Sequence, residues 1–168
     1  MSGEHDERHD GFEELLADLD TPMFIVTAAA GNERDGCLVG FTTQCSIDPS
    51  QFAVWLSKQN RTYRIARHAS TLVVHLVRED QCELADWFGG ETGDEVDKLA
   101  GIDWHAGPDG APVLSGCDWF GGRVLERVDV GGDHVAFVLE PLGGEVSRRG
   151  TRPLGLQRAK HIDPGHDA

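Results

Sequence analysis

The sequence predicts a mainly β protein of one domain, built as an antiparallel barrel. Six short apolar runs lie between turn signals, which is the pattern of strands that follow one another in a sheet. Only two convincing helices interrupt these runs, and both are short, so a parallel sheet with alternating strands and helices is not expected. With 168 residues, the chain has the length of a single domain with a sizeable core.

The strands are predicted from the apolar runs and from the residues between them. Gly31-Asn32, Asp48-Pro49 and Gly131-Gly132-Asp133 supply turn conformations, and proline stops a ladder because it lacks an N–H group. The six predicted strands are Met23–Ala30, Cys37–Ile47, Gln51–Ser57, Leu72–Val77, Trp119–Val128 and His134–Leu142.

Helical spacing of apolar residues predicts a short amphipathic helix over residues 10–20, which Thr21-Pro22 ends. The interior helices are predicted at Arg61–Ala69 and Gln81–Phe88. We divide the chain into an acidic flexible tail (1–10), one domain (11–157) that closes with a strand at Thr151–Gln157, and a polar C-terminal tail (158–168).

Charge and composition exclude several classes of protein. The net charge of −14 is concentrated in residues 1–20 and 78–98, each with eight acids. General nucleic-acid binding is not expected, because it needs clustered Lys and Arg. No apolar run approaches the ~20 residues of a membrane span, and the acidic N-terminus fits no secretory or transit signal. We therefore expect a cytoplasmic protein with no membrane partner. The four cysteines match no zinc or redox spacing and are expected to be reduced thiols.

Residues 49–78 contain no Asp or Glu, although the chain as a whole is strongly acidic. The same window carries five basic residues, namely Lys58, Arg61, Arg64, Arg67 and Arg78. It is a candidate anion site, with a basic helix face that balances the acidic segments as the alternative. Within it, Ser57–Thr62 leaves a strand and opens a helix with Asn60 as N-cap, so a phosphate could be held there. Neither a G-x-G-x-x-G motif nor a P-loop occurs in the chain.

Four stretches follow one another in a fixed order. Gly36–Pro49 is a hydroxyl-containing strand that ends in Ser46-Ile47-Asp48-Pro49, and Leu56–Thr62 follows it. Leu84–Phe88 then precedes Asp97-Lys98-Leu99. Finally, Pro112–Trp119 runs on through Arg123–Val128 to Gly132-Asp133-His134. This ordered set, over residues 20–145, resembles the flavin reductase family with the FMN-binding split-barrel fold.

The resemblance implies a six-stranded Greek-key split barrel and a homodimer that binds FMN or FAD near the subunit interface. It also implies an NAD(P)H:flavin oxidoreductase with NADH or NADPH as co-substrate. In many members the reductase supplies reduced flavin to a monooxygenase partner. Hydride would pass from nicotinamide C4 to flavin N5, which requires orientation of two rings and no general base.

The positions of this sequence that match the family's motifs are the expected site residues. The residues that would border the isoalloxazine ring are Val39, Gly40, Phe41, Gln44 and Cys45. Those that would bind the ribityl chain and phosphate are Ser57, Lys58, Asn60 and Thr62. Phe88 would lie beside the flavin and Lys98 near its phosphate. His134 would contact the nicotinamide nucleotide and is the catalytic candidate.

The chain departs from the family pattern at two places. Leu38 and Gly40 replace hydroxyl or amide side chains, so ring contacts there would come mainly from backbone groups. Thr151–Gln157 lacks the aromatic residues that many members carry. This second departure keeps an alternative open, a flavin carrier or sensor without catalytic activity on the same barrel. A split barrel that uses another cofactor, such as a deazaflavin or haem, is a further alternative.

Other side chains are given structural interpretations. His75 is expected to be a hydrogen-bonded histidine of the core or an interface. Cys45 is interpreted as a small buried hydrophobe, with redox activity as the alternative. His5 and His9, and His161 and His166, lie in the predicted tails, and no metal site is expected from them.

Overall fold

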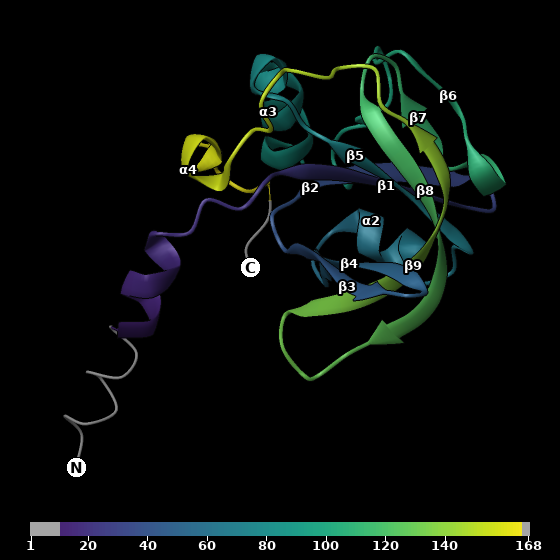
Figure 1. Cartoon of the computed structure of the whole chain (residues 1–168). Helices are drawn as coiled ribbons and strands as arrows, with labels where there is room; N and C mark the ends of the chain where they lie inside the picture. The colour runs from purple at the N-terminus through teal and green to yellow at the C-terminus, as the bar shows by residue number, and fades with distance from the viewer. Residues whose placement is uncertain (1–10, 166–168) are drawn as a thin grey trace.

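A seven-stranded antiparallel sheet dominates the computed structural model, which describes residues 11–165 (Figure 1). The strand order is β2-β1-β5-β8-β9-β4-β3, and every neighbouring pair runs antiparallel. The two end strands, β2 and β3, are joined by the short turn Gly40-Phe41, so the sheet curls back on itself. The Trp55 N–H donates to the Phe41 carbonyl oxygen at 2.9 Å, which extends the β3–β4 pairing into this turn. The prediction of a mainly β, antiparallel barrel is confirmed.

The elements have the following bounds. The strands of the main sheet are β1 (Phe24–Ala30), β2 (Glu33–Val39), β3 (Thr42–Ile47), β4 (Ser50–Ser57), β5 (Thr71–Leu76), β8 (Asp118–Val128) and β9 (His134–Glu145). A separate hairpin joins β6 (Trp104–Ala106) to β7 (Pro112–Leu114). The helical elements are 11–17, α2 (Arg61–Ala66), η1 (Glu79–Gln81), α3 (Cys82–Gly90), η2 (Pro108–Gly110) and α4 (Leu156–Ala159).

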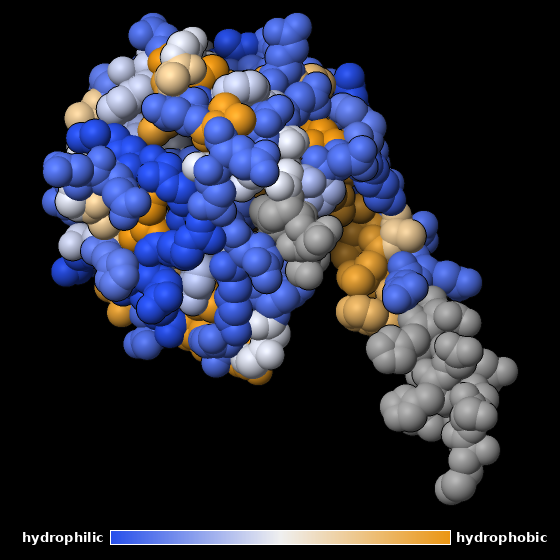
Figure 2. Space-filling model, turned by 180° about the vertical axis from the view of Figure 1, so that it is seen from behind, coloured by the Kyte–Doolittle hydropathy of each residue, from blue (hydrophilic) through white to orange (hydrophobic). Residues whose placement is uncertain are grey.

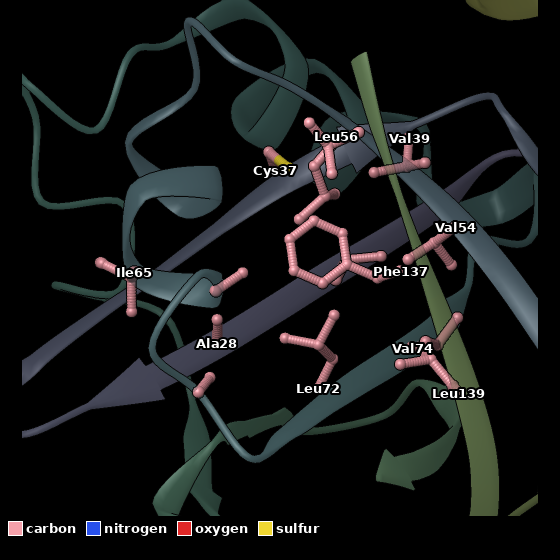
Figure 3. Packing of buried hydrophobic residues seen from close by; sticks show 14 residues of the cluster. Ala28, Cys37, Val39, Val54, Leu56, Ile65, Leu72, Val74, Phe137 and Leu139 are labelled. Atoms are coloured by element: carbon pink, nitrogen blue, oxygen red, sulfur yellow. The ribbon is translucent and has the colours of Figure 1, made fainter. Parts of the chain in front are cut away.

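Two large apolar clusters hold most of these elements together, and a small third one, Val73, Ala111 and Val113, packs the β6–β7 hairpin against β5. In the first, the fully buried Phe137 ring lies among side chains from β1, β2, β4, β5 and α2 (Figure 3). The second joins the end of the sheet to α3, α4 and the C-terminal segment, with Phe88 and Leu154 fully buried. β1 and β5 are buried along most of their length, because the second cluster and the β6–β7 hairpin cover the face of the sheet that points away from the first cluster. β3 and the later parts of β8 and β9 are mostly exposed.

Several predicted elements differ in number or bounds from those observed. The single strand predicted at Cys37–Ile47 is two strands, because the chain turns at Gly40-Phe41 between β2 and β3. Helix α2 ends at Ala66, three residues before the predicted end, and α3 is preceded by the turn η1. The hairpin β6–β7 was not predicted, since three-residue strands give no periodic signal.

Where the strand Thr151–Gln157 was predicted, residues 151–155 form an extended segment with two isolated bridges, Pro22↔Gly155 and Arg78↔Pro153, and Leu156 begins α4. Pro153 has no N–H group, so a regular ladder cannot pass through it. The Met23 N–H donates to the Leu154 carbonyl oxygen at 2.8 Å, which inserts this segment beside the start of β1. Residues 156–164 then lie against the domain, with Ile162 packed on the second cluster. The domain boundary drawn at 157 stays a prediction, and the tail predicted at 1–10 lies outside the described residues.

The helix 11–17 projects from the barrel (Figure 1). Its apolar side chains Phe12, Leu15 and Leu16, with Leu19 just beyond it, are exposed. They form an apolar surface on the projecting segment (Figure 2). Among residues 11–165, no helix is both long enough and apolar enough to cross a bilayer.

Candidate functional site

A cavity of about 300 Å³ lies where the end of β4 and the start of β9 meet α3 and the C-terminal segment. The register of the sheet sets Ser57 of β4 opposite His134 of β9, and both line this cavity. The other lining residues are Met23, Cys37, Leu38, Asn60, Phe88, Gly89, Leu156, Ala159, Lys160, Ile162 and Pro164. Four of the predicted site residues, Ser57, Asn60, Phe88 and His134, are therefore brought together from distant parts of the chain.

An apolar cavity of about 460 Å³ lies next to the first and shares Leu156 with it. It is lined by Leu16, Leu19, Thr21, Gly40, Phe41, Thr42, Trp55 and Leu156. The Phe41 ring lies 5.1 Å from the His134 ring, between centroids, and thus joins the two cavities. The two neighbouring cavities offer polar groups at Ser57 and Asn60 and an apolar surface at Gly40 and Phe41. Such a region suits an amphipathic ligand with a flat apolar part and a polar tail.

Ser57 at the end of β4 and His134 at the start of β9 line the first cavity, and Lys58 follows Ser57 in the loop; we call these three residues the rim. Asn60 has the extended backbone of a helix N-cap, as predicted, although its side chain makes no capping hydrogen bond. Lys58 points away from the cavity and donates to Asp129 Oδ1 at 3.0 Å. This hydrogen bond holds the pKa of the Asp129 carboxyl below its usual range. Lys58 is thus engaged with the β8–β9 turn.

Three polar side chains are buried directly behind the cavity, and we call them the floor (Asp35, Thr62 and Lys98). Thr62 Oγ1 donates to Asp35 Oδ2 at 3.0 Å. Lys98 Nζ donates to the carbonyl oxygen of Phe88 at 3.4 Å and lies 6.0 Å from its ring centroid. The predicted ligands Thr62 and Lys98 are therefore covered by the lining residues and do not themselves line the cavity.

The thiol of Cys37 lies between floor and cavity. Burial raises its pKa to about 11, and Lys98 and Asp35 act on it with opposite, smaller effects. The thiol is therefore protonated at neutral pH, which makes it a poor nucleophile. The opposite charges of Asp35 and Lys98 occupy the same buried region.

His134 stands at the mouth of the first cavity with its side chain 25% exposed. Its Nδ1 lies 2.7 Å from Asp133 Oδ1, and this contact lowers the pKa of the Asp133 carboxyl. The imidazole is held by Asp133 on one side and by the Phe41 ring on the other. It can present its Nε2 edge and ring face to a ligand.

The remaining predicted ring contacts lie elsewhere. Val39 is buried in the first apolar cluster. Gln44 and Cys45 lie on β3, at the edge of the sheet, beside a shallow cavity with Ser46, Ile47 and Asp48. Cys45 is exposed, so its interpretation as a buried hydrophobe is wrong. The assignment of these three residues to an isoalloxazine ring stays a prediction.

The C-terminal segment supplies lining residues that the sequence analysis did not identify. Leu156, Lys160 and Ile162 also line the first cavity. The one signal in the sequence was the apolar spacing of Leu154, Leu156 and Ile162 in a segment that is otherwise polar. Lys160 contributes the one lysine that lines the first cavity.

Other predicted histidines have structural contacts. His75 is fully buried, its Nδ1 lies 2.9 Å from the Ile25 carbonyl oxygen, and its Nε2 accepts from the Leu114 N–H at 3.0 Å. The prediction of a hydrogen-bonded core histidine is confirmed. His161 contacts Asp86 at 2.9 Å, whereas His5, His9 and His166 lie outside the described residues. In the described part of the chain, no group of three His, Cys, Asp or Glu residues could hold a metal ion.

Comparison with known proteins identifies the family of this fold. Residues 16–163 match the family described as "Flavin reductase like domain". HsaB of Rhodococcus jostii (strain RHA1), the reductase subunit of a flavin-dependent monooxygenase, is 31% identical over 160 residues, covering 91% of this chain and 77% of that protein. A protein of Rhizobium meliloti (strain 1021) named "Probable flavin reductase" is 28% identical over 144 residues. That alignment covers 83% of this chain, which spans only 44% of the length of the Rhizobium protein.

A solved structure supports the same conclusion. Nitrilotriacetate monooxygenase component B from Mycobacterium thermoresistibile superimposes with a TM-score of 0.77 at 25% identity, covering 92% of this chain and 86% of that one. The names of these relatives agree with the predicted class of flavin oxidoreductase, and the predicted resemblance is confirmed. The chain belongs to the flavin reductase like domain family.

Proposed function

We propose that this protein is an NAD(P)H-dependent flavin reductase that binds FMN in the two joined cavities and delivers reduced flavin to a monooxygenase. The observation that carries the proposal is the meeting of Ser57, Asn60 and His134 with an apolar region at Gly40 and Phe41. The names of the relatives, which include reductase subunits of monooxygenases, support the last part.

The residues present fit a flavin. The ribityl phosphate would lie at Ser57 and Asn60, where hydroxyl and amide groups can donate hydrogen bonds to phosphate oxygens. Both residues belong to the window without acids, so no carboxylate of this loop opposes the phosphate. The isoalloxazine would lie against Gly40, Phe41 and Leu156, where a flat apolar ring is sheltered from water.

When bound, the flavin supplies the hydride-accepting chemistry. The residues of the chain bind the flavin and the nicotinamide nucleotide, orient the two rings and exclude water from them. The backbone N–H groups of the Gly40–Thr42 turn can donate to negative charge that develops at the ring. His134 would bind the nicotinamide nucleotide at the mouth of the cavity, held in position by Asp133 and Phe41. Phe88, fully buried, closes the inner wall.

We propose further that the protein acts as a homodimer. β3 is an edge strand, and Phe41 just before it and Ile47 at its end are 58% and 86% exposed. An exposed apolar edge of this kind is an interaction surface. Sedimentation equilibrium, with and without FMN, measures the oligomeric state directly, and a monomer under both conditions contradicts the dimer.

The first test is an anaerobic titration of the protein and FMN with NADH and then with NADPH, followed by flavin absorption. We expect bleaching far faster than in a protein-free control, and the faster nucleotide is the donor. With FMN in large excess over protein, continued bleaching marks a reductase of free flavin. Flavin that binds and stays oxidised identifies a carrier or sensor instead.

A matched pair of variants tests where the flavin binds. Ser57→Ala should raise the Kd for FMN by about tenfold, the usual loss for a hydrogen bond to a charged group. Ser115→Ala, in an exposed turn that lines neither cavity, should leave it unchanged. If the two variants have equal Kd values for FMN, Ser57 does not bind the phosphate.

A further inference from the structure

The chain reaches α4 through a loop, residues 146–153, that contributes nothing to the apolar core. After β9 the chain runs past α3 to α4, where Leu156 lines both cavities and Lys160 lines the first (Figure 1). None of residues 146–153 is buried. The path of the 146–153 loop therefore depends on its polar contacts, because no buried apolar side chain fixes it.

An ion pair that is nearly buried holds this loop. Arg78 follows β5 and Asp118 begins β8, and their side chains are 11% and 3% exposed. Arg78 Nε donates to Asp118 Oδ2 at 3.0 Å, and Arg78 Nη2 donates to the same oxygen. Among the pairs of Lys or Arg with Asp or Glu in residues 11–165, this one is the most buried.

Both members of the pair also bind the main chain of the loop. Asp118 Oδ1 accepts the N–H groups of Ser147 at 2.8 Å and Arg148 at 3.0 Å. Arg78 Nη1 donates to the Thr151 carbonyl oxygen at 2.9 Å. Burial alone would raise the pKa of the Asp118 carboxyl, but the hydrogen bonds from Arg78 and from the two N–H groups lower it below its usual range. Charge-assisted hydrogen bonds, which are stronger than neutral ones, thus hold the loop near both of its ends.

The chain is short between this loop and the wall of the cavities. The Leu154 N–H donates at 2.9 Å to the carbonyl oxygen of Val77, the residue before Arg78. Leu156 then begins α4, which is followed by Lys160. The residues around Arg78 therefore set the position at which the segment with Leu156 and Lys160 starts.

We infer that Arg78 and Asp118 are a positioning pair for flavin binding, which holds the C-terminal segment so that Leu156 and Lys160 complete the wall of the two cavities. The inference rests on the proposed function, since these cavities are the proposed flavin site. Neither Arg78 nor Asp118 lines either cavity, so the pair acts only through the segment. A buried ion pair adds little net stability, because desolvation offsets the attraction. The planar fork of arginine instead favours one arrangement of the groups that it joins.

The test measures the Kd for FMN by flavin fluorescence and the rates of cleavage by trypsin, both in the full chain. Asp118→Asn removes the charge and keeps the size of the side chain. Cleavage after Arg149, which is exposed in the loop, reports on release of the loop. Cleavage after Arg127, within β8, reports on opening of the barrel. Because the loop has no buried residue, it can leave the barrel without unfolding it.

Two further variants complete the set. Arg123→Gln is the matched control, because Arg123 also lies on β8 and its Nε and Nη2 both donate to one oxygen of Glu140. Among residues 11–165, the Arg123 side chain makes no hydrogen bond to the loop, and it lines neither cavity. Arg78→Lys keeps a cation opposite Asp118 but lacks the fork, so this variant folds even if Asp118→Asn does not.

We expect Asp118→Asn to raise the Kd for FMN by about tenfold, as for a segment that is in place for about a tenth of the time. Cleavage after Arg149 should accelerate about tenfold more than cleavage after Arg127. Arg78→Lys should change both quantities in the same direction by a smaller factor, and Arg123→Gln should change neither.

Three results would overturn the inference. If FMN binds to the wild type and neither Asp118→Asn nor Arg78→Lys changes its Kd by more than about twofold, the pair does not position the site. If cleavage after Arg149 and after Arg127 accelerates equally, the pair stabilises the whole domain and has no separate effect on the segment. If FMN does not bind to the wild type, the proposed function fails first, and this inference fails with it.

Discussion

The floor and the rim of the first cavity use the same kinds of residue in opposite environments. Lys98 and Lys58 were both predicted to lie at a flavin phosphate, yet Lys98 is 1% exposed and Lys58 is partly exposed and paired with Asp129. A buried charge depends on its few neighbours, because water cannot replace a lost partner. A solvated charge is screened by salt, and water replaces a partner that it loses. The floor should therefore govern stability, whereas the rim should govern ligand affinity.

The largest effect is expected at the floor. Asp35→Ala removes the acceptor of the Thr62 hydroxyl, and it removes a carboxylate from the buried region that it shares with Lys98. The free energy of unfolding should fall by about 3 kcal/mol, the usual cost of leaving a buried charge uncompensated. Urea denaturation measures this change. Asp35→Asn keeps an acceptor for Thr62, so its difference from Asp35→Ala isolates the hydrogen bond. A loss below about 1 kcal/mol in Asp35→Ala would mean that Lys98 does not depend on Asp35.

His75 of β5 is a second buried titratable side chain, and we expect it too to govern stability. Burial lowers the pKa of His75 to about 4, from 6.5 in the unfolded chain. Between these values the unfolded chain binds a proton and the folded chain does not, so stability falls as pH decreases from about 6.5 to about 4. The total loss should approach about 3 kcal/mol. Urea denaturation from pH 7.5 to 4.5 measures it, with His75→Asn as control. Parallel curves for the wild type and the variant would contradict this assignment.

The same contrast explains what could be predicted from the sequence. Ser57 and Asn60 could be located from the sequence because a strand ends and a helix begins there, whereas the role of His134 was expected only from the family resemblance. Antiparallel pairing of β4 with β9 brings Ser57 and His134 opposite each other. Thr62 and Lys98 were expected at the ligand, but their burial depends on Asp35 and Phe88, which are distant in the chain. Leu156 and Lys160 were missed because their contacts come from a segment without regular strand pairing. The pattern of residues along the sequence predicts where a strand or helix ends. It does not predict which side chains from distant parts of the chain cover the residues at that end.

At the rim, His134→Ala should affect one ligand more than the other. Its imidazole stands at the mouth of the cavity beside Phe41 and is 25% exposed. We expect the KM for the better nicotinamide donor to rise by about tenfold, with a change in the Kd for FMN below about threefold. Steady-state kinetics give the KM for the nucleotide, and flavin fluorescence gives the Kd for FMN. His105→Ala, an exposed histidine on β6, is the control. A larger effect on FMN than on the nucleotide would make His134 a part of the flavin site.

The smallest effect is expected at Lys58, because its ammonium is already engaged by Asp129 at 2.9 Å. Lys58→Ala should raise the Kd for FMN by less than about fivefold, and Asp129→Asn should lower it, since this variant frees the ammonium for the phosphate. Both changes should vanish at about 1 M salt, where solvated charges are screened within about 3 Å. Flavin fluorescence titrations at low and high salt measure them. A much larger loss of FMN affinity in Lys58→Ala that persists at high salt would mean that Lys58 leaves Asp129 and becomes buried against the ligand. The contrast between floor and rim would then hold only for the protein without flavin.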